Sequence, residues 1–168
     1  PEMLPLDNID AVVITHAHVD HIGMLPVLFR YGYKGPVYCT QPTRDLMTLL
    51  QMDYIKVAQA EGNEAPYSKS DIQECIKHVV DVNWGEKTYI APDIKMTMEN
   101  AGHILGSSSV YMQIGEGRTE HKLLFSGDIK YEKSWLFDAA TVRFNKVDTL
   151  VIESTDGRPQ RTHPTRQQ

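Results

Sequence analysis

Four potential metal ligands stand within six residues of one another, directly after an apolar run. The run covers residues 11–14, and His16, His18, Asp20 and His21 follow it. Alternate residues of an extended chain point the same way, so His16 and His18 can bind one ion while Asp20 and His21 reach a second. The alternative is a histidine-rich polar loop, but so many polar groups beside a buried strand are costly to desolvate. The pattern therefore predicts a hydrolytic metal site at a strand end.

Length and composition favour a single globular domain. The chain has 168 residues, of which 41% are hydrophobic, enough for one ordinary core. Its longest apolar run is too short to cross a bilayer and no secretory signal opens the chain, so we expect a cytoplasmic protein with no membrane partner. Cys39 and Cys75 form no CxxC pair and are expected to be packing residues. The net charge of -5 argues mildly against a general nucleic-acid coat, although bound cations still attract a polyanion.

Apolar runs alternate with helical patterns along the chain, which favours a layered α/β arrangement. Period-two and apolar runs predict strands at 9–14, 36–40, 95–98, 110–114, 122–125 and 149–152, with a hairpin at 115–117. Helices are predicted at 22–30 and at 43–60, the second capped by Thr43. A third helix is expected to start at a capping box at Ser70 and to carry an apolar stripe through Val80.

Three further ligand-type residues stand where predicted strands end, namely His103, Asp128 and Glu153. Sheets of α/β proteins collect their functional groups at such ends. One His or Asp after a glycine is usually a turn residue, but together with the 16–21 cluster these residues indicate one shared site. For Glu153, position alone favours a strand-end carboxylate that caps the next helix.

The ligand pattern resembles a known signature. Residues 16–21 resemble the HxHxDH motif of the metallo-β-lactamase superfamily, and His103 and Asp128 match its later His and Asp ligands. Residues 152–155 resemble the acidic motif of the β-CASP branch, whose members are nucleases acting on RNA or DNA. Two longer stretches, 29–40 and 42–50, resemble the archaeal homologues of the cleavage and polyadenylation specificity factor. The resemblance covers the chain up to about Thr155.

This resemblance implies an αββα sandwich that is only partly present. The chain corresponds to the first half of the fold, without the opening strands, the β-CASP insertion and the C-terminal half. Residues 1–155 are accordingly expected to form a partial metallo-β-lactamase domain. Residues 156–168 are polar and contain proline, so we expect a flexible tail.

The resemblance also implies roles for the site residues. Two zinc ions are expected, with His16, His18 and His103 on one, Asp20 and His21 on the other, and Asp128 bridging both. Two such cations clamp the attacking and leaving oxygens of a phosphodiester and lower the pKa of a bound water from about 15.7 toward 7. Asp20 is then expected to accept the proton of that water, and Glu153 to orient a histidine that protonates the leaving oxygen.

The predicted function is that of a zinc-dependent ribonuclease that cuts single-stranded RNA in 3'-end processing or transcription termination. It acts as an endonuclease, with or without exonuclease activity, and its parent protein is expected to dimerise through contacts outside this chain. The family's second-site histidine and leaving-group histidine fall in regions absent here, so the isolated chain is expected to be weak or inactive. Two alternatives stay open: a small-molecule ester or thioester hydrolase of the same superfamily, and a non-catalytic RNA-processing subunit.

Overall fold

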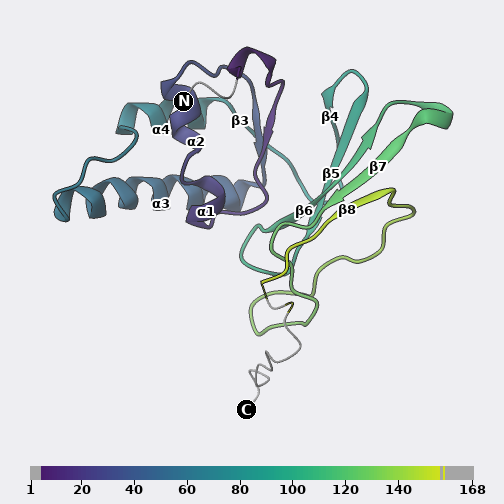
Figure 1. Cartoon of the computed structure of the whole chain (residues 1–168). Coiled ribbons are helices and arrows are strands. Elements are labelled where there is room, and N and C mark those ends of the chain that lie inside the picture. The colour runs from purple at the N-terminus through teal and green to yellow at the C-terminus, as the bar shows by residue number, and fades with distance from the viewer. Residues whose placement is uncertain (1–4, 156, 158–168) are drawn as a thin grey trace.

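The computed structural model describes residues 5–155 and 157, which form three layers (Figure 1). Helices cover one face of a three-stranded sheet, and a five-stranded sheet lies against the other face. The helices are η1 (Leu6–Asn8), α1 (Val19–Ile22), α2 (Leu25–Arg30), α3 (Gln41–Ala60), α4 (Lys69–Lys77) and η2 (Gly117–Thr119). The strands are β1 (Val12–Val13), β2 (Val37–Cys39), β3 (Val79–Asp81), β4 (Lys87–Ala91), β5 (Ile94–Asn100), β6 (Ser108–Ile114), β7 (His121–Phe125) and β8 (Thr149–Val151).

The order of strands brings the ends of several strands to one edge of the sandwich. The smaller sheet runs β1-β2-β3 and is parallel throughout. In the larger sheet β4 to β7 are antiparallel neighbours, and β8 pairs parallel with β7. Strands β5, β7 and β8 therefore point the same way, and the segments that follow them meet at the same edge.

The core lies on both faces of the small sheet because its side chains alternate. Val37 and Cys39 point toward the helices and pack with residues such as Met47. Val13 and Tyr38 point the other way, against a cluster on the large sheet formed by Met96, Met98 and Val110. A strand buried on both faces reads as a continuous apolar run, and this is why period two is absent there.

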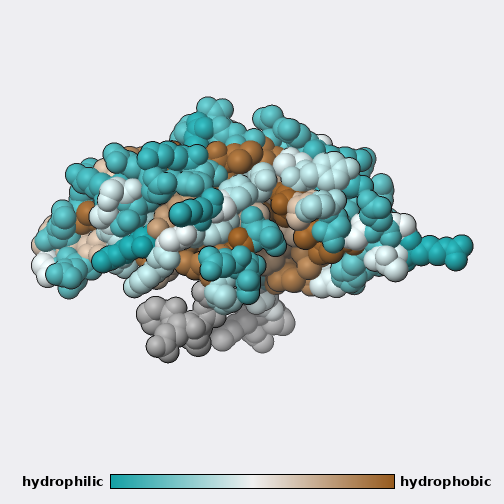
Figure 2. All heavy atoms as spheres, turned by 90° about the horizontal axis from the view of Figure 1, so that it is seen from above, coloured by the Kyte–Doolittle hydropathy of each residue, from teal (hydrophilic) through white to brown (hydrophobic). Residues whose placement is uncertain are grey.

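The large sheet is covered only in part. No helix lies over its outer face in the described residues (Figure 1). On the inner face, Phe125 and Val151 share a side with buried Val110 yet stay 40% and 43% exposed. Seen from above, apolar residues gather toward the middle of the molecule and polar residues cover its ends (Figure 2). The expectation of a layered α/β fold that represents part of an αββα sandwich is confirmed.

Several predicted boundaries were wrong. The helix expected at 22–30 is two helices, α1 and α2, separated at Gly23 and Met24. The strand expected at 9–14 is limited to Val12–Val13, because η1 and its flanks occupy the residues before it. Strand β4 was not predicted, since it lies at a sheet edge and none of its side chains is fully buried.

Two predicted helix caps were also wrong. The cap of α3 is Thr40, whose hydroxyl oxygen accepts a hydrogen bond from the Thr43 backbone N–H. The capping box of α4 pairs Ser68 with Asp71 and does not start at Ser70. The helix stops at Lys77, so the last part of the expected stripe forms β3. In both cases the true cap lies two or three residues before the predicted one and offers the same hydroxyl chemistry.

The burial of the cysteines and the length and polarity of the helices bear on the remaining expectations. Cys39 and Cys75 are both buried and unpaired, as expected of packing residues, and burial raises the pKa of each to about 12. Over the described residues, the helices are either too short or too polar to cross a membrane. Apart from Gly157, the tail at 156–168 lies outside the described residues, and the domain limit at 155 stays a prediction.

Met98 offers a direct test of the packing between the sheets, because its side chain is completely buried in the cluster on the large sheet. We expect Met98→Ala to lower the free energy of unfolding by about 2 to 5 kcal/mol. Met24→Ala is the matched control, since Met24 is 63% exposed, and should change it by less than about 0.5 kcal/mol. Urea denaturation of both variants measures this, and equal effects would contradict the assigned core.

Candidate metal centre

The segment after β1 presents two imidazoles side by side. His16 is fully buried, and its Nε2 lies 3.1 Å from Nδ1 of His18. The other ring nitrogen of His16, Nδ1, lies 3.1 Å from the Thr15 hydroxyl, which fixes the ring orientation. His18 is the N-cap residue of α1 but makes no side-chain capping bond. Its ring is turned toward the other histidines instead.

The turn after β5 carries His103. Gly102 has φ +69°, and a Cβ there would lie 2.7 Å from the backbone nitrogen of Ala140, so this position requires glycine. The Ser107 hydroxyl accepts hydrogen bonds from the backbone N–H groups of His103 and Ile104, both at 3.1 Å. The turn is therefore closed on itself, with the imidazole at its start.

The turn after β7 carries Asp128. Gly127 has φ +57°, and a Cβ there would lie 2.9 Å from Cβ of Thr15, so this turn passes close to the His16 segment. The backbone N–H of Ser126 donates to the Val151 carbonyl at 2.9 Å, which ties the start of the turn to β8. Asp128 is thus held at the edge where β7 and β8 end.

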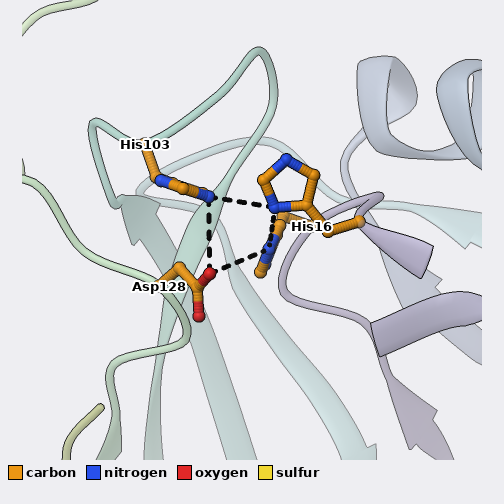
Figure 3. Close-up of side chains that lie close together, drawn as sticks. His16, His103 and Asp128 are labelled. Carbon is orange, nitrogen blue, oxygen red and sulfur yellow. Dashed lines mark hydrogen bonds and ion pairs between the residues drawn. The ribbon is translucent and has the colours of Figure 1, made fainter. Parts of the chain in front are cut away.

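Four of the predicted ligands converge on one point. Nε2 of His16, Nδ1 of His18, Nε2 of His103 and Oδ2 of Asp128 all lie within 4.8 Å of one another. Figure 3 shows His16, His103 and Asp128 pointing toward each other from three separate segments. His18 Nδ1 lies 3.1 Å from Nε2 of both His16 and His103, and Asp128 Oδ2 lies 3.6 and 3.4 Å from the same two atoms.

Four of these separations are those expected around a tetrahedral ion, and the group as a whole spans up to 4.8 Å. With metal–ligand bonds of about 2.0 to 2.1 Å, the corners of a tetrahedron are about 3.3 Å apart. The spacing of 3.1 to 3.6 Å brackets that value. The donor set of three imidazole nitrogens and one carboxylate oxygen is also the type that holds zinc and similar metals. The residues present therefore fit a bound metal ion.

A second, more open group shares Asp128 with the first. Nε2 of His21 lies 3.5 Å from Oδ1 of Asp128 and 3.4 Å from Oδ2 of Asp20. Asp20 is 79% exposed, whereas Asp128 is 26% exposed. The two oxygens of Asp128 thus face the two groups separately, an arrangement that suits a carboxylate between two cations.

Burial sets the charge of the central histidine. Desolvation, together with the nearby rings of His21, His103 and His18, lowers the pKa of His16 to about 3. Desolvation also lowers the pKa of His103, although the Asp128 carboxylate opposes the shift. Both imidazoles are therefore neutral at physiological pH. Neutral imidazole is the form that binds metal, so no proton has to leave these two ligands first.

Glu153 lies beside the site and not among the ligand atoms. Its carboxylate accepts hydrogen bonds from the backbone N–H of Ile129 at 3.0 Å and of Thr155 at 3.2 Å. Burial raises the pKa of Glu153, but the hydrogen bonds from Thr155 and Ile129 outweigh that effect and leave the pKa below its ordinary value. The group is an ionised acceptor for two backbone donors.

The structure brings all six predicted ligands to one edge of the sandwich. It also shows supporting residues that sequence reasoning did not include: Thr15 at the His16 ring, Ser107 inside the His103 turn, and Ser126 at the start of the Asp128 turn. Each is a hydroxyl residue within four positions of a ligand, and this proximity is the signal that could have marked them. His78 and His121 bond to Glu74 and Thr149 respectively, away from the site.

Comparisons with known proteins agree with this geometry. A family model described as beta-lactamase superfamily domain matches residues 2–167. The chain is 52% identical over 164 residues to the transcription termination factor FttA of Methanosarcina mazei, covering 98% of this chain and 25% of that protein. It is 51% identical over 163 residues to FttA of Methanocaldococcus jannaschii and 48% over 161 residues to FttA of Lokiarchaeum sp., covering 97% and 96% of this chain.

The chain spans about a quarter of the length of these curated relatives. The range matched by the family model, residues 2–167, includes the segment from His16 to Asp128. With the converging donor atoms and the partial sandwich already described, this establishes that the chain belongs to the metallo-β-lactamase superfamily and is homologous to the archaeal termination factors named FttA.

Proposed function

We propose that this chain is the metal-binding part of a longer zinc-dependent ribonuclease of the β-CASP branch, which hydrolyses phosphodiester bonds in single-stranded RNA. The observation that carries the proposal is the group of four donor atoms within 4.8 Å of one another, four of whose separations are 3.1 to 3.6 Å, with the second oxygen of Asp128 turned to a further group. The name of the relatives, transcription termination factor, supports a role in termination or RNA 3'-end processing.

In this proposal one zinc would be held by His16, His18, His103 and Asp128, and the other by Asp20, His21 and Asp128. Imidazole and carboxylate ligands suit zinc, and a two-metal site supplies charge stabilisation at the phosphate and a nucleophilic water of lowered pKa. The second group has three ligand residues in the chain, and its Asp20 is largely exposed. We therefore expect it to bind metal more weakly than the first.

The chain's own groups divide the remaining work. Asp20 accepts the proton of the attacking water, and its exposed carboxylate passes that proton to solvent. Asp128 holds its two oxygens toward the two ligand groups and so fixes their separation. Glu153 is assigned the orientation of a histidine that protonates the leaving oxygen, with that histidine supplied from outside this chain. We further propose RNA as the partner, the cytoplasm as the compartment, and a homodimeric parent protein.

Zinc titration of the purified chain tests the metal assignment. We expect one tightly bound zinc and a second bound far more weakly or not at all, because the second group is more open. His16→Ala should weaken the tight zinc by more than the roughly 10- to 100-fold that loss of a supporting partner costs. His121→Ala is the matched control, since its ring contacts Thr149 away from the site. Unchanged affinity in His16→Ala would contradict the assignment, and two fully occupied zincs would contradict the expected weakness of the second group.

RNA cleavage is tested in a full-length protein that contains this sequence. We expect His16→Ala and Asp128→Ala to slow cleavage of single-stranded RNA on the order of 1000-fold, because metal stabilisation of the transition state is worth several kcal/mol. His78→Ala, a substitution on the helical side, should cleave normally. Wild-type rates in both site variants would overturn the nuclease proposal. Hydrolysis of esters or thioesters alone would support the small-molecule alternative, and bound zinc with no hydrolysis at all would support a non-catalytic subunit.

Metal removal exposes a pH dependence that follows from His16. Its pKa is 6.5 when unfolded and about 3 in the fold, so between these values the unfolded chain binds a proton that the native chain does not. The contribution of neutral His16 to the free energy of unfolding is therefore complete above pH 6.5 and is lost as the pH falls toward 3. In chelator, the free energy of unfolding should fall more steeply from pH 6.5 to 5 in the wild type than in His16→Asn. Urea denaturation at several pH values measures this, and equal slopes would argue against a neutral, buried His16.

A further inference from the structure

The carboxylate of Glu153 lies directly behind the turn that carries Asp128. One of its oxygens, Oε1, accepts a hydrogen bond from the backbone N–H of Ile129 at 3.0 Å, and Ile129 is the residue immediately after Asp128. The other oxygen, Oε2, accepts from the backbone N–H of Thr155 at 3.2 Å. The side chain thus joins the end of the Asp128 turn to the segment that follows β8.

The start of the same turn is bonded to backbone groups at the end of β8 and in the segment that follows it. The N–H of Ser126 donates to the Val151 carbonyl at 2.9 Å, and the N–H of Glu153 donates to the Ser126 hydroxyl at 3.2 Å. The turn at 126–129 is therefore fastened at both ends to residues 151–153. Of these bonds, only the one at Ile129 depends on a side chain from residues 151–153, that of Glu153.

The position of this turn matters because the two carboxylate oxygens of Asp128 face different histidines. Its Oδ2 lies 3.4 Å from His103 Nε2, and its Oδ1 lies 3.5 Å from His21 Nε2. Gly127 lets the backbone turn tightly at φ +57° but adds conformational freedom in the same place. A hydrogen bond to an ionised carboxylate is roughly twice as strong as a neutral one, so Glu153 is suited to remove that freedom.

We propose that Glu153 is a positioning residue for Asp128, acting by accepting the Ile129 N–H, in addition to any role toward a histidine. This inference rests on the proposed metal site. It places Glu153 in the metal-binding function of the chain itself, and it predicts that zinc affinity depends on the acceptor oxygen and on the reach of the side chain. The negative charge alone is then insufficient.

Three substitutions separate these properties. Glu153→Gln keeps the length and one carbonyl oxygen, so it can still accept the Ile129 N–H. Glu153→Asp keeps the charge but is one methylene shorter, so it cannot reach that donor without moving the turn. Glu153→Ala removes both, and Glu132→Ala is a matched control at an exposed carboxylate outside these hydrogen bonds. The zinc dissociation constant, the visible spectrum with Co²⁺ in place of zinc, and hydrogen exchange of the Ile129 amide in the metal-free chain are measured for each.

We expect Glu153→Ala and Glu153→Asp to weaken zinc binding about 10- to 100-fold, to alter the Co²⁺ spectrum and to speed exchange of the Ile129 amide. Glu153→Gln should lie between Glu153→Asp and the wild type, because its neutral carbonyl accepts the Ile129 N–H more weakly than the carboxylate does, and Glu132→Ala should stay close to the wild type in all three. If Glu153→Ala does not fold, the order of Gln and Asp decides the question. Wild-type behaviour of Glu153→Asp, or a loss in Glu153→Gln equal to that in Glu153→Asp, would overturn the inference. A wild type that binds no zinc would instead refute the proposed metal site.

Discussion

The face-to-face packing of the two sheets brings the ligand residues of separate segments together. Val13 and Tyr38 of the small sheet pack against Met96, Met98 and Val110 of the large one. The small sheet carries His16, and the large sheet carries His103 and Asp128, so neither sheet holds a complete ligand group. A hydrogen bond from the Ser108 N–H to the Thr15 carbonyl, 2.8 Å long, joins the sheets right beside the ligands. Burial of apolar side chains thereby fixes the distance between imidazoles that are far apart in sequence.

Local polar contacts then refine what the core brings together. The Thr15 hydroxyl orients the His16 ring, the Ser107 hydroxyl closes the His103 turn, and the Glu153 carboxylate holds the residue after Asp128. Each contact is made to another atom of the ligand residue or to its neighbour in sequence, so the ligand atom itself is free. The cost is visible at His18, which caps α1 without a side-chain capping bond because its ring nitrogen faces the other histidines.

The layers of the fold and the grouping of the ligands could be predicted from the sequence, but contacts between distant residues could not. The alternation of apolar runs and helical patterns was enough for the layers, and the spacing of His16 and His18 was enough to place their rings together. The cap of α3 could not be chosen from the sequence, because Thr40 and Thr43 have the same chemistry. The Thr40 hydroxyl also donates to the Gly106 carbonyl, a partner 66 residues away that only the folded chain brings near. The contact of Glu153 with Ile129 is likewise long-range, and the motif containing Glu153 suggested a different partner.

X-ray absorption of the zinc-loaded chain reports the atoms around the metal without requiring activity. The account predicts about four nitrogen and oxygen neighbours at roughly 2.0 to 2.1 Å, with the multiple scattering of imidazole rings and no sulfur. In a His103→Ala sample, loss of one imidazole contribution would show that a ligand from the large sheet joins the ligands from the small sheet at the metal. A sulfur shell at about 2.3 Å, or six oxygen neighbours without imidazole, would contradict the claim that His16, His18, His103 and Asp128 form the metal centre.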